Sequence, residues 1–305
     1  MSSSESASAE STGSTGSTAA ASFGAPVLGQ PRRRGWLPFS PWHLFLMPLA
    51  LLFATPLVQM VLTALKTDAE IRRFPPSLLP HHPTLHGFIA LFTDSDVLRW
   101  IANSVIVASS AVLAHMVLCS LAGYGFSRMR FAGRNAAFVL VIATIMIPTQ
   151  LLMIPTYIMF SKIGIVNTLP SIIVPWLSSA FGVFLMRQFF LSLPVELEEA
   201  ARLDGCSALG VFWRIILPLA RPALATLAIF TLLGSWNDLI WPLISISDDR
   251  WFTLQLGLAN FQGTRRTEWQ MLMAGNVVAT LPLITFFLVA QKHFIATMTF
   301  SGLKG

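Results

Sequence analysis

The chain has 305 residues, of which 54% are hydrophobic and only 11% are charged, and its mean hydropathy is +0.67. Because soluble domains carry about 25% charged residues, these values exclude a soluble globular protein and indicate a chain that lies largely in lipid. The net charge of +6 and the pI near 10.0 would suggest nucleic-acid binding in a soluble protein, but here the Lys and Arg residues flank apolar stretches, as membrane topology requires.

The N-terminal segment is rich in Ser, Ala, Gly and Thr. Such a composition buries too little apolar surface to offset the entropy of ordering, so we predict that residues 1–35 form a disordered cytoplasmic tail. Arg32, Arg33 and Arg34 then precede a long apolar stretch. This stretch is too long for a signal peptide and lacks a small-residue cleavage site, so we predict that it stays in the protein as the first span.

Six stretches are long and apolar enough to cross a hydrocarbon core about 30 Å thick, which takes about 20 helical residues. They cover residues 42–65, 100–126, 135–160, 170–191, 222–246 and 269–293. Prolines inside them, such as Pro148 and Pro282, are tolerated in lipid because neighbouring helices satisfy the freed carbonyl groups. The sequence therefore predicts an all-α, polytopic transmembrane helical bundle of six spans, formed by residues 36–305.

The basic residues predict the orientation of the bundle. Most of them fall on the side of the two termini, and the clearest group is Arg128, Arg130 and Arg134 in the short loop after the second span. By the positive-inside rule, both termini are expected to be cytoplasmic. On the opposite side, residues 67–96 are too polar and Pro-rich to span, and the apolar cluster around Phe88 predicts a short helix on the outer surface.

Residue types that hold metals or act as nucleophiles form no recognisable site. Cys119 and Cys206 are far apart and lack metal-ligand spacing, so both are interpreted as structural. His81, His82 and His86 are close in sequence, but no carboxylate or cysteine completes a ligand set, which favours an ordinary loop. The sequence also lacks a phosphate-cradling glycine loop and a nucleophile with its base. We therefore predict no metal, no bound cofactor and no catalytic residue in this chain.

The longest predicted cytoplasmic segment, residues 192–221, has the pattern of two short helices. Acidic residues such as Glu199 lie near the positively polarised N-terminus of the first helix, and Gly205 ends it because glycine adopts a left-handed conformation at low cost. A second helix is predicted from Ser207 until Pro218 stops it. Two stiff helices joined at a glycine form a compact protrusion below the membrane.

The spacing in this segment resembles the cytoplasmic loop of importer permeases of the ATP-binding-cassette (ABC) superfamily, which carries a Glu-Ala-Ala (EAA) motif. The matching positions are Glu199, Ala200, Ala201, Gly205, Ile215, Leu217 and Pro218. Further stretches, among them residues 103–104, 122–128 and 236–243, are similar to the carbohydrate branch of this superfamily. The resemblance runs from about residue 42 to residue 305 and is closest to the smaller, six-span permease of the maltose-transporter type.

The resemblance implies a type I ABC importer permease fold and a multi-pass protein of the bacterial or archaeal inner membrane. It implies that the 192–221 loop docks into a cleft on a cytoplasmic ATPase. The residues that would form this joint are Glu199, Ala200, Ala201, Asp204, Gly205, Ile215, Leu217 and Pro218. Without the resemblance, Glu199 and Asp204 would be interpreted as the solvated acidic face of a helix end. Residues 302–305 resemble the family's C-terminal tail.

The partners follow from the same resemblance. They are a second permease subunit, expected to be a different chain, two ABC ATPase subunits, an extracytoplasmic solute-binding protein and the lipid bilayer. ATP and Mg would be bound by the ATPase, so this chain would be a non-catalytic subunit that binds no cofactor itself. Nucleic acid is not an expected partner.

Two further groups are candidates for contact with the solute or with the binding protein. Asp238 is the only acidic residue inside a predicted span, and a charge in lipid is costly enough to suggest function. The candidates for the solute path or a gate are therefore Trp236, Asn237 and Asp238, the alternative being that they stabilise helix packing. By resemblance, the candidates for contact with the binding protein in the outer loop are Trp251, Phe252 and Gln262, the alternative being an ordinary connector.

The sequence thus predicts a permease subunit of an ABC importer that translocates a sugar or a related polar solute. An ABC permease for a non-sugar solute, such as a glycerol phosphate or a peptide, is the alternative within this class. An ion-coupled secondary transporter predicts internal repeats or several intramembrane carboxylates, whereas the chain has no clear repeat and one candidate acid. A membrane-anchored sensor predicts a sizeable soluble domain, which the sequence lacks.

Overall fold

In the computed structural model of the protein, the described residues are 42–263 and 267–301, with side chains up to residue 289. The predicted tail of residues 1–35 and the C-terminal residues 302–305 lie outside this part. Within it, apart from one isolated bridge between Gln262 and Thr267, the chain forms helices without strands. The predicted all-α fold is therefore confirmed.

The helices follow one another along the chain with short connections. In chain order they are α1 (Trp42–Ala64), α2 (Asp68–Ile71), α3 (His86–Thr93), α4 (Val97–Arg128), α5 (Arg134–Ala143), η1 (Thr144–Met146), α6 (Thr149–Lys162), α7 (Leu169–Ile173), η2 (Val174–Trp176), α8 (Ala180–Ser192), α9 (Glu196–Leu203), α10 (Ala208–Val211), η3 (Phe212–Ile216), α11 (Leu217–Leu219), α12 (Arg221–Trp236), α13 (Ile240–Ser245), η4 (Asp249–Trp251), α14 (Leu254–Ala259) and α15 (Trp269–Ser301). The short helix expected around Phe88 is α3.

Four helices of the described part are long and apolar enough to cross a membrane, namely α1, α4, the run from α7 to α8, and α15. Two further candidates are bent pairs: residues 134–146 meet α6 at 101°, and residues 208–219 meet α12 at 77°. The predicted count of six spans therefore holds only if each bent pair is counted as one span. The first bend follows from Pro148, because Ile147 before it takes an extended conformation with ψ of 117°.

The fifth predicted span is also shorter than expected. Helix α12 ends at Trp236, and α13 starts only at Ile240, so residues 237–239 form a break between them. Asp238 consequently lies at a helix end and not inside a continuous helix, which corrects the sequence-based placement. A helix end leaves backbone groups without intrahelical partners, and a carboxylate is more easily satisfied there than on a lipid-facing helix surface.

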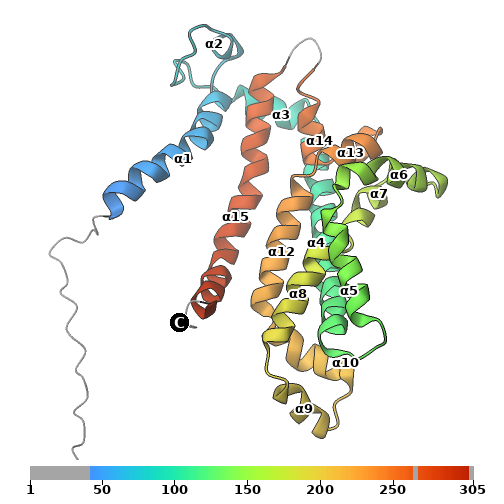
Figure 1. Cartoon of the computed structure of the whole chain (residues 1–305). Helices are drawn as coiled ribbons and strands as arrows, with labels where there is room; N and C mark the ends of the chain where they lie inside the picture. Colours follow the sequence, from blue (N-terminus) through green and yellow to red (C-terminus); the bar gives the residue numbers. More distant parts are fainter. Residues whose placement is uncertain (1–41, 264–266, 302–305) are drawn as a thin grey trace, which may run out of the picture. The chain divides into compact units, whose positions relative to one another are not determined.

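Helix α4 is central to the packing, because it lies against both α8 and α12 (Figure 1). Small residues allow the close approach: a Cβ atom added at Gly123 of α4 would lie 2.8 Å from the Cβ of Met186 on α8, and one added at Gly182 of α8 would lie 2.8 Å from the Sγ of Cys119 on α4. Helices α4, α8 and α12 thus form one packed unit. A larger side chain at either glycine would push α4 and α8 apart.

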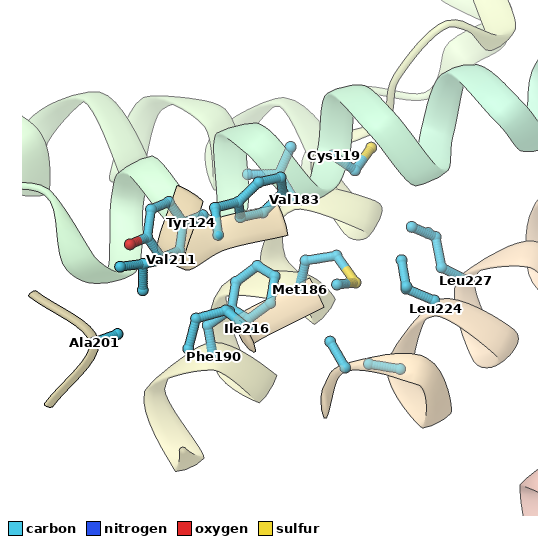
Figure 2. Packing of buried hydrophobic residues seen from close by; sticks show 13 residues of the cluster. Cys119, Tyr124, Val183, Met186, Phe190, Ala201, Val211, Ile216, Leu224 and Leu227 are labelled. Atoms are coloured by element: carbon cyan, nitrogen blue, oxygen red, sulfur yellow. The ribbon is translucent and has the colours of Figure 1, made fainter. Parts of the chain in front are cut away.

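Two buried clusters close the ends of this unit. Toward the 192–221 loop, residues of α4, α8 and α12 pack with Ala201, Val211 and Ile216 of the loop (Figure 2). At the opposite end, Trp100 of α4 packs with residues of α3, α14 and α15. A Cβ atom added at Gly257 of α14 would lie only 2.2 Å from two ring atoms of Trp100, so this end is equally tight. The loop is therefore held on the ends of three packed helices.

Candidate functional site

The first helix of the 192–221 loop, α9, forms as the sequence predicts. Glu196, Glu198 and Glu199 lie in its first turn, where carboxylates interact favourably with the positive end of the helix dipole. The helix ends at Leu203, and Gly205 takes a φ of +82°, a left-handed conformation that favours glycine. The backbone N–H groups of residues 205 and 206 donate to the carbonyls of residues 202 and 201, at 3.0 Å each, and thereby satisfy the last turn.

The second helical part differs from the prediction. It begins at α10, where the Ser207 hydroxyl accepts a hydrogen bond from the N–H of Gly210 at 3.2 Å. It then widens into a π-helical turn, η3, and Pro218 lies inside the following turn, α11, instead of stopping the helix. In the wider turn Leu217 N–H donates to Phe212 O, five residues back, and Pro218 directly follows this π-turn. The chain turns only after Ala220, where α12 begins.

The residues predicted to meet the ATPase divide into two sets. The exposed set comprises Glu199, Ala200, Asp204, Gly205 and Pro218, and the set that packs wholly or partly into the core comprises Ala201, Ile215 and Leu217. Along α9 the spacing places Glu199, Ala200 and Leu203 on one face, which we call the exposed face of α9. Leu203 is 90% exposed, so this face presents one apolar side chain beside a carboxylate and a small residue.

The opposite side of α9 carries an ion pair that the sequence analysis did not identify. Arg128, at the C-terminus of α4, places its Nε 2.8 Å from Glu198 Oε1, and the two side chains are only 9% and 3% exposed. The Tyr124 hydroxyl donates to Glu198 Oε2 at 3.3 Å, and Arg202 Nη2 lies 3.6 Å from the same oxygen. The sequence contained one signal for this pair: Glu198 precedes the buried Ala201 by three residues and so shares its face.

Aromatic rings join the second part of the loop to the same helices. Phe212 of η3 lies 5.1 Å from the ring of Tyr124 and 6.4 Å from the ring of Phe190 on α8. Tyr124 and Phe190 also meet edge to face, at 6.1 Å. Because buried aromatic contacts of this kind stabilise beyond their area, the loop is a packed extension of α4 and α8.

The three candidates for the solute path occupy different environments. Trp236 is buried, and its Nε1 donates to the carbonyl of Ala279 on α15 at 3.1 Å, so this residue has the alternative role of stabilising helix packing. Asn237 is exposed, and its Oδ1 accepts a hydrogen bond from Gln255 at 3.5 Å. Asp238 is half-buried and accepts a hydrogen bond from the Nε1 of Trp176 at 3.2 Å. Asn237 and Asp238 therefore stay candidates for the path, and Trp236 belongs to the core.

The three outer-loop candidates do not form one exposed patch. Trp251 and Phe252 are half-buried against the core, whereas Gln262 is exposed. The Nδ2 of Asn103 on α4 donates to the carbonyls of Arg250 and Phe252, at 2.9 Å each, and thereby fixes this loop to α4. Nearby, hydrogen bonds from Arg250 lower the pKa of Asp248 to about 2, so this carboxylate is ionised at neutral pH.

The remaining sulfur- and nitrogen-bearing side chains are dispersed. Cys119 is buried in the core near the carbonyl of Ser179, and Cys206 is half-buried in the loop. In the part of the chain that the structure describes, no three His, Cys, Asp or Glu side chains come close enough together to hold a metal ion.

Comparisons with known proteins agree with this arrangement. Residues 115–299 match the family described as "Binding-protein-dependent transport system inner membrane component". The chain is 36% identical over 264 residues to the arabinooligosaccharides transport system permease protein AraQ of Halalkalibacterium halodurans, covering 84% of this chain and 93% of AraQ. It is 30% identical to the sn-glycerol-3-phosphate transport system permease protein UgpE of Yersinia pestis, covering 83% of this chain and 93% of UgpE.

A solved structure is similar over most of the chain. It belongs to a bacterial ABC transporter involved in the import of the acidic polysaccharide alginate, and the superposition has a TM-score of 0.72. The match covers 84% of this chain and 99% of that chain, at 22% sequence identity. At this identity the likeness establishes the fold, and it agrees with the arrangement of helices around α4.

Proposed function

The chain belongs to the family of binding-protein-dependent inner-membrane transport components, and on this premise we propose that it is the permease subunit of an ABC importer for a sugar or a related polar solute. The observation that carries the proposal is the 192–221 loop. Its core-facing side is packed onto α4 and α8, while Glu199, Ala200 and Leu203 remain exposed on α9. A surface of this kind is suited to dock into a partner that pushes on the bundle.

The loop also supports an orientation. Arg128 and the loop are in contact, so Arg130 and Arg134 lie on the same side of the membrane as α9. By the positive-inside rule this side is the cytoplasm, where an ATPase would bind ATP and Mg, and both termini would be cytoplasmic as well. The other partners would be a second permease chain and an extracytoplasmic solute-binding protein.

The transport cycle would follow from differential binding. Closure of the two ATPase subunits around ATP favours the arrangement of the permeases that fits the closed ATPases, and release after hydrolysis restores the other arrangement. This chain supplies no catalytic group in that cycle. Its task is to hold the loop in a defined position and to pass the movement on to the spans.

The solute class rests on the relatives. AraQ is named for arabinooligosaccharides, and the similar solved transporter imports a polysaccharide, which favours a carbohydrate. UgpE is named for sn-glycerol-3-phosphate, so a glycerol phosphate is the second candidate. On the path itself, the side chains proposed to meet the solute are Asn237 and Asp238, since their polar atoms lie at the break between α12 and α13.

The proposal is tested by uptake into proteoliposomes that contain this chain, its companion permease and the ATPase. The binding protein is added outside together with labelled arabinooligosaccharides, monosaccharides, polyols or glycerol 3-phosphate, and ATP is enclosed inside. We expect uptake of one class, dependent on hydrolysable ATP and insensitive to ionophores. Uptake that is driven by an imposed Na⁺ or H⁺ gradient without ATP would instead establish an ion-coupled secondary transporter.

A further inference from the structure

Helix α9 reaches the spanning helices mainly through side chains. Its backbone packs against α10 and η3, which belong to the same loop. Between α9 and the end of α4 lies an open cavity of about 780 Å³, which Ser127, Val195 and Ala208 help to line. Packing therefore does not fill this space, and the link from α9 to α4 depends on the few side chains that cross it.

The crossing is made by Glu198, Arg128 and Tyr124. Glu198 Oε1 forms an ion pair with Arg128 Nε at 2.8 Å, outside hydrogen-bond geometry, and Glu198 Oε2 accepts a hydrogen bond from the Tyr124 hydroxyl at 3.3 Å. Both acceptor oxygens are thus engaged by α4, the helix that packs against α8 and α12. A buried carboxylate with two such partners has little freedom to rotate away, because any other position would leave charged groups buried and unpaired.

Arg128 holds a third element at the same time. Its Nη2 donates to the carbonyls of Phe190 and Leu193, at 2.7 and 2.6 Å, at the C-terminal end of α8. Phe190 O also accepts the backbone N–H of Leu193 at 3.2 Å, and both carbonyls lie at the negatively polarised end of α8, where a cation is favourable. One guanidinium thus joins α4, the end of α8 and α9, which a lysine cannot reproduce because it lacks the planar fork of donors.

We propose that Glu198 and Arg128 are positioning residues that fix α9 to the end of α4, so that the two helices move as one body when an ATPase displaces the loop. The inference rests on the proposed function, because it needs a partner that acts on the loop. It assigns different roles to neighbouring carboxylates: Glu199 on the exposed face contacts the partner, and Glu198 delivers the resulting movement to α4. Without this link, α9 is held to the bundle only indirectly, by its chain connections, by its packing on α10 and η3, and by the core contact of Ala201.

The test measures the distance between α9 and α4 in the complete transport complex. Spin labels are placed at Leu197→Cys on α9 and at Met129→Cys after α4, which are both exposed and are not among the residues proposed to contact the ATPase. The background carries Cys206→Ser, while the fully buried Cys119 is kept. Distances are compared between the nucleotide-free complex and the complex trapped with ADP and vanadate, in the parent, in Glu198→Gln and in Arg128→Lys. The control for the distance is Glu196→Gln, which removes a carboxylate from the exposed face of α9 and leaves Glu198 paired with Arg128.

We expect one narrow distance in the parent and in Glu196→Gln, the same in both nucleotide states. In Glu198→Gln and Arg128→Lys we expect a broad distribution that shifts on trapping. Solute imported per ATP hydrolysed should fall about tenfold or more in these two variants, because one charge is left buried without its full set of partners. Loss of the fold alone would lower hydrolysis and import together, whereas loss of the link lowers import relative to hydrolysis.

The link is refuted if the parent distance changes between the two states, or if Glu198→Gln keeps the narrow distance and the parent ratio of import to hydrolysis. A parent distance that changes refutes the link even if a variant does not assemble. A parent complex that neither hydrolyses ATP nor imports any solute of the panel contradicts the proposed function itself, so the two failures are distinguishable.

Discussion

Replacement of Gly205 separates docking from folding. Three glycines in the described part have similar left-handed backbones, with φ of +82° at Gly205, +78° at Gly133 and +74° at Gly164. A Cβ atom added at any of the three would meet no other atom within 4 Å. Substitution by alanine therefore causes no clash, and its cost is the left-handed strain of about 1 to 2 kcal/mol. Because the strain is the same at all three sites, Gly133→Ala and Gly164→Ala are matched controls.

We expect the three alanine variants to lower the thermal midpoint in detergent by similar amounts. Only Gly205→Ala and Gly205→Asp should lower ATP-coupled uptake per inserted molecule and weaken co-purification of the ATPase. Asp is the sharper variant, since it tolerates the left-handed conformation better and places a charge on the docking surface. A loss of more than about tenfold corresponds to more than 1.4 kcal/mol beyond the shared strain. Equal losses of uptake in Gly133→Ala and Gly205→Ala would refute the docking role of Gly205.

Three further outcomes follow from the packing, the α12–α13 break and the outer segment. Gly257→Ala should destabilise the protein by about 1 to 3 kcal/mol, because its Cβ would overlap Trp100. Gly125→Ala has open space around its Cβ and should be neutral or stabilising by about 0.5 to 1 kcal/mol. Thermal melts in detergent compare the two variants. Trp236→Phe should cost about 1 kcal/mol of stability through the lost hydrogen bond to Ala279 and should leave uptake per folded molecule unchanged. Asp238→Asn should lower uptake without a change in the melting temperature. Equal losses of uptake in the two variants would contradict the assignment of Trp236 to the core and of Asp238 to the solute path. Hydrogen bonds from the Ser77 hydroxyl and the His81 N–H lower the pKa of Glu70 below its ordinary value of 4.5. The ionised Glu70 therefore contributes its full stabilisation above pH 4.5, and this contribution is lost as the pH falls through the lowered pKa of Glu70 in the folded protein. Limited proteolysis of the outer segment should therefore accelerate at acidic pH, and Glu70→Gln should abolish this dependence on the carboxylate; an unchanged pH profile in Glu70→Gln would count against it.

Much of the helical architecture was predictable because lipid restricts the backbone. A chain in hydrocarbon must satisfy its N–H and C=O groups internally, so an apolar stretch of sufficient length predicts a helix without knowledge of its neighbours. Four of the six predicted spans correspond to helices of sufficient length, and α4 and α15 extend beyond their predicted ends. Gly205 was predictable for a similarly local reason, since the left-handed end of a helix depends on a single residue.

The interruptions were not predictable from hydropathy. Hydropathy predicts one continuous span across Pro148 and another across Asp238, yet the chain bends at the first and breaks at the second. At Pro218 the sequence predicts a stop, yet the helix continues. Each depends on whether neighbouring elements accept the freed backbone groups and the new direction. Proline permits a bend at both Pro148 and Pro218, and only the packing around each ring decides whether the helix bends there or a few residues later.

The amino-acid sequence by itself determined the helical class, the membrane location and a loop whose spacing marks a family, because each depends on composition or on contacts between near neighbours. The tertiary structure alone decided which carboxylate of the loop is structural. Glu196, Glu198 and Glu199 share one helical turn and one chemical type, and only the placement of α9 beside the end of α4 brings Glu198 to Arg128 while it leaves the other two in solvent.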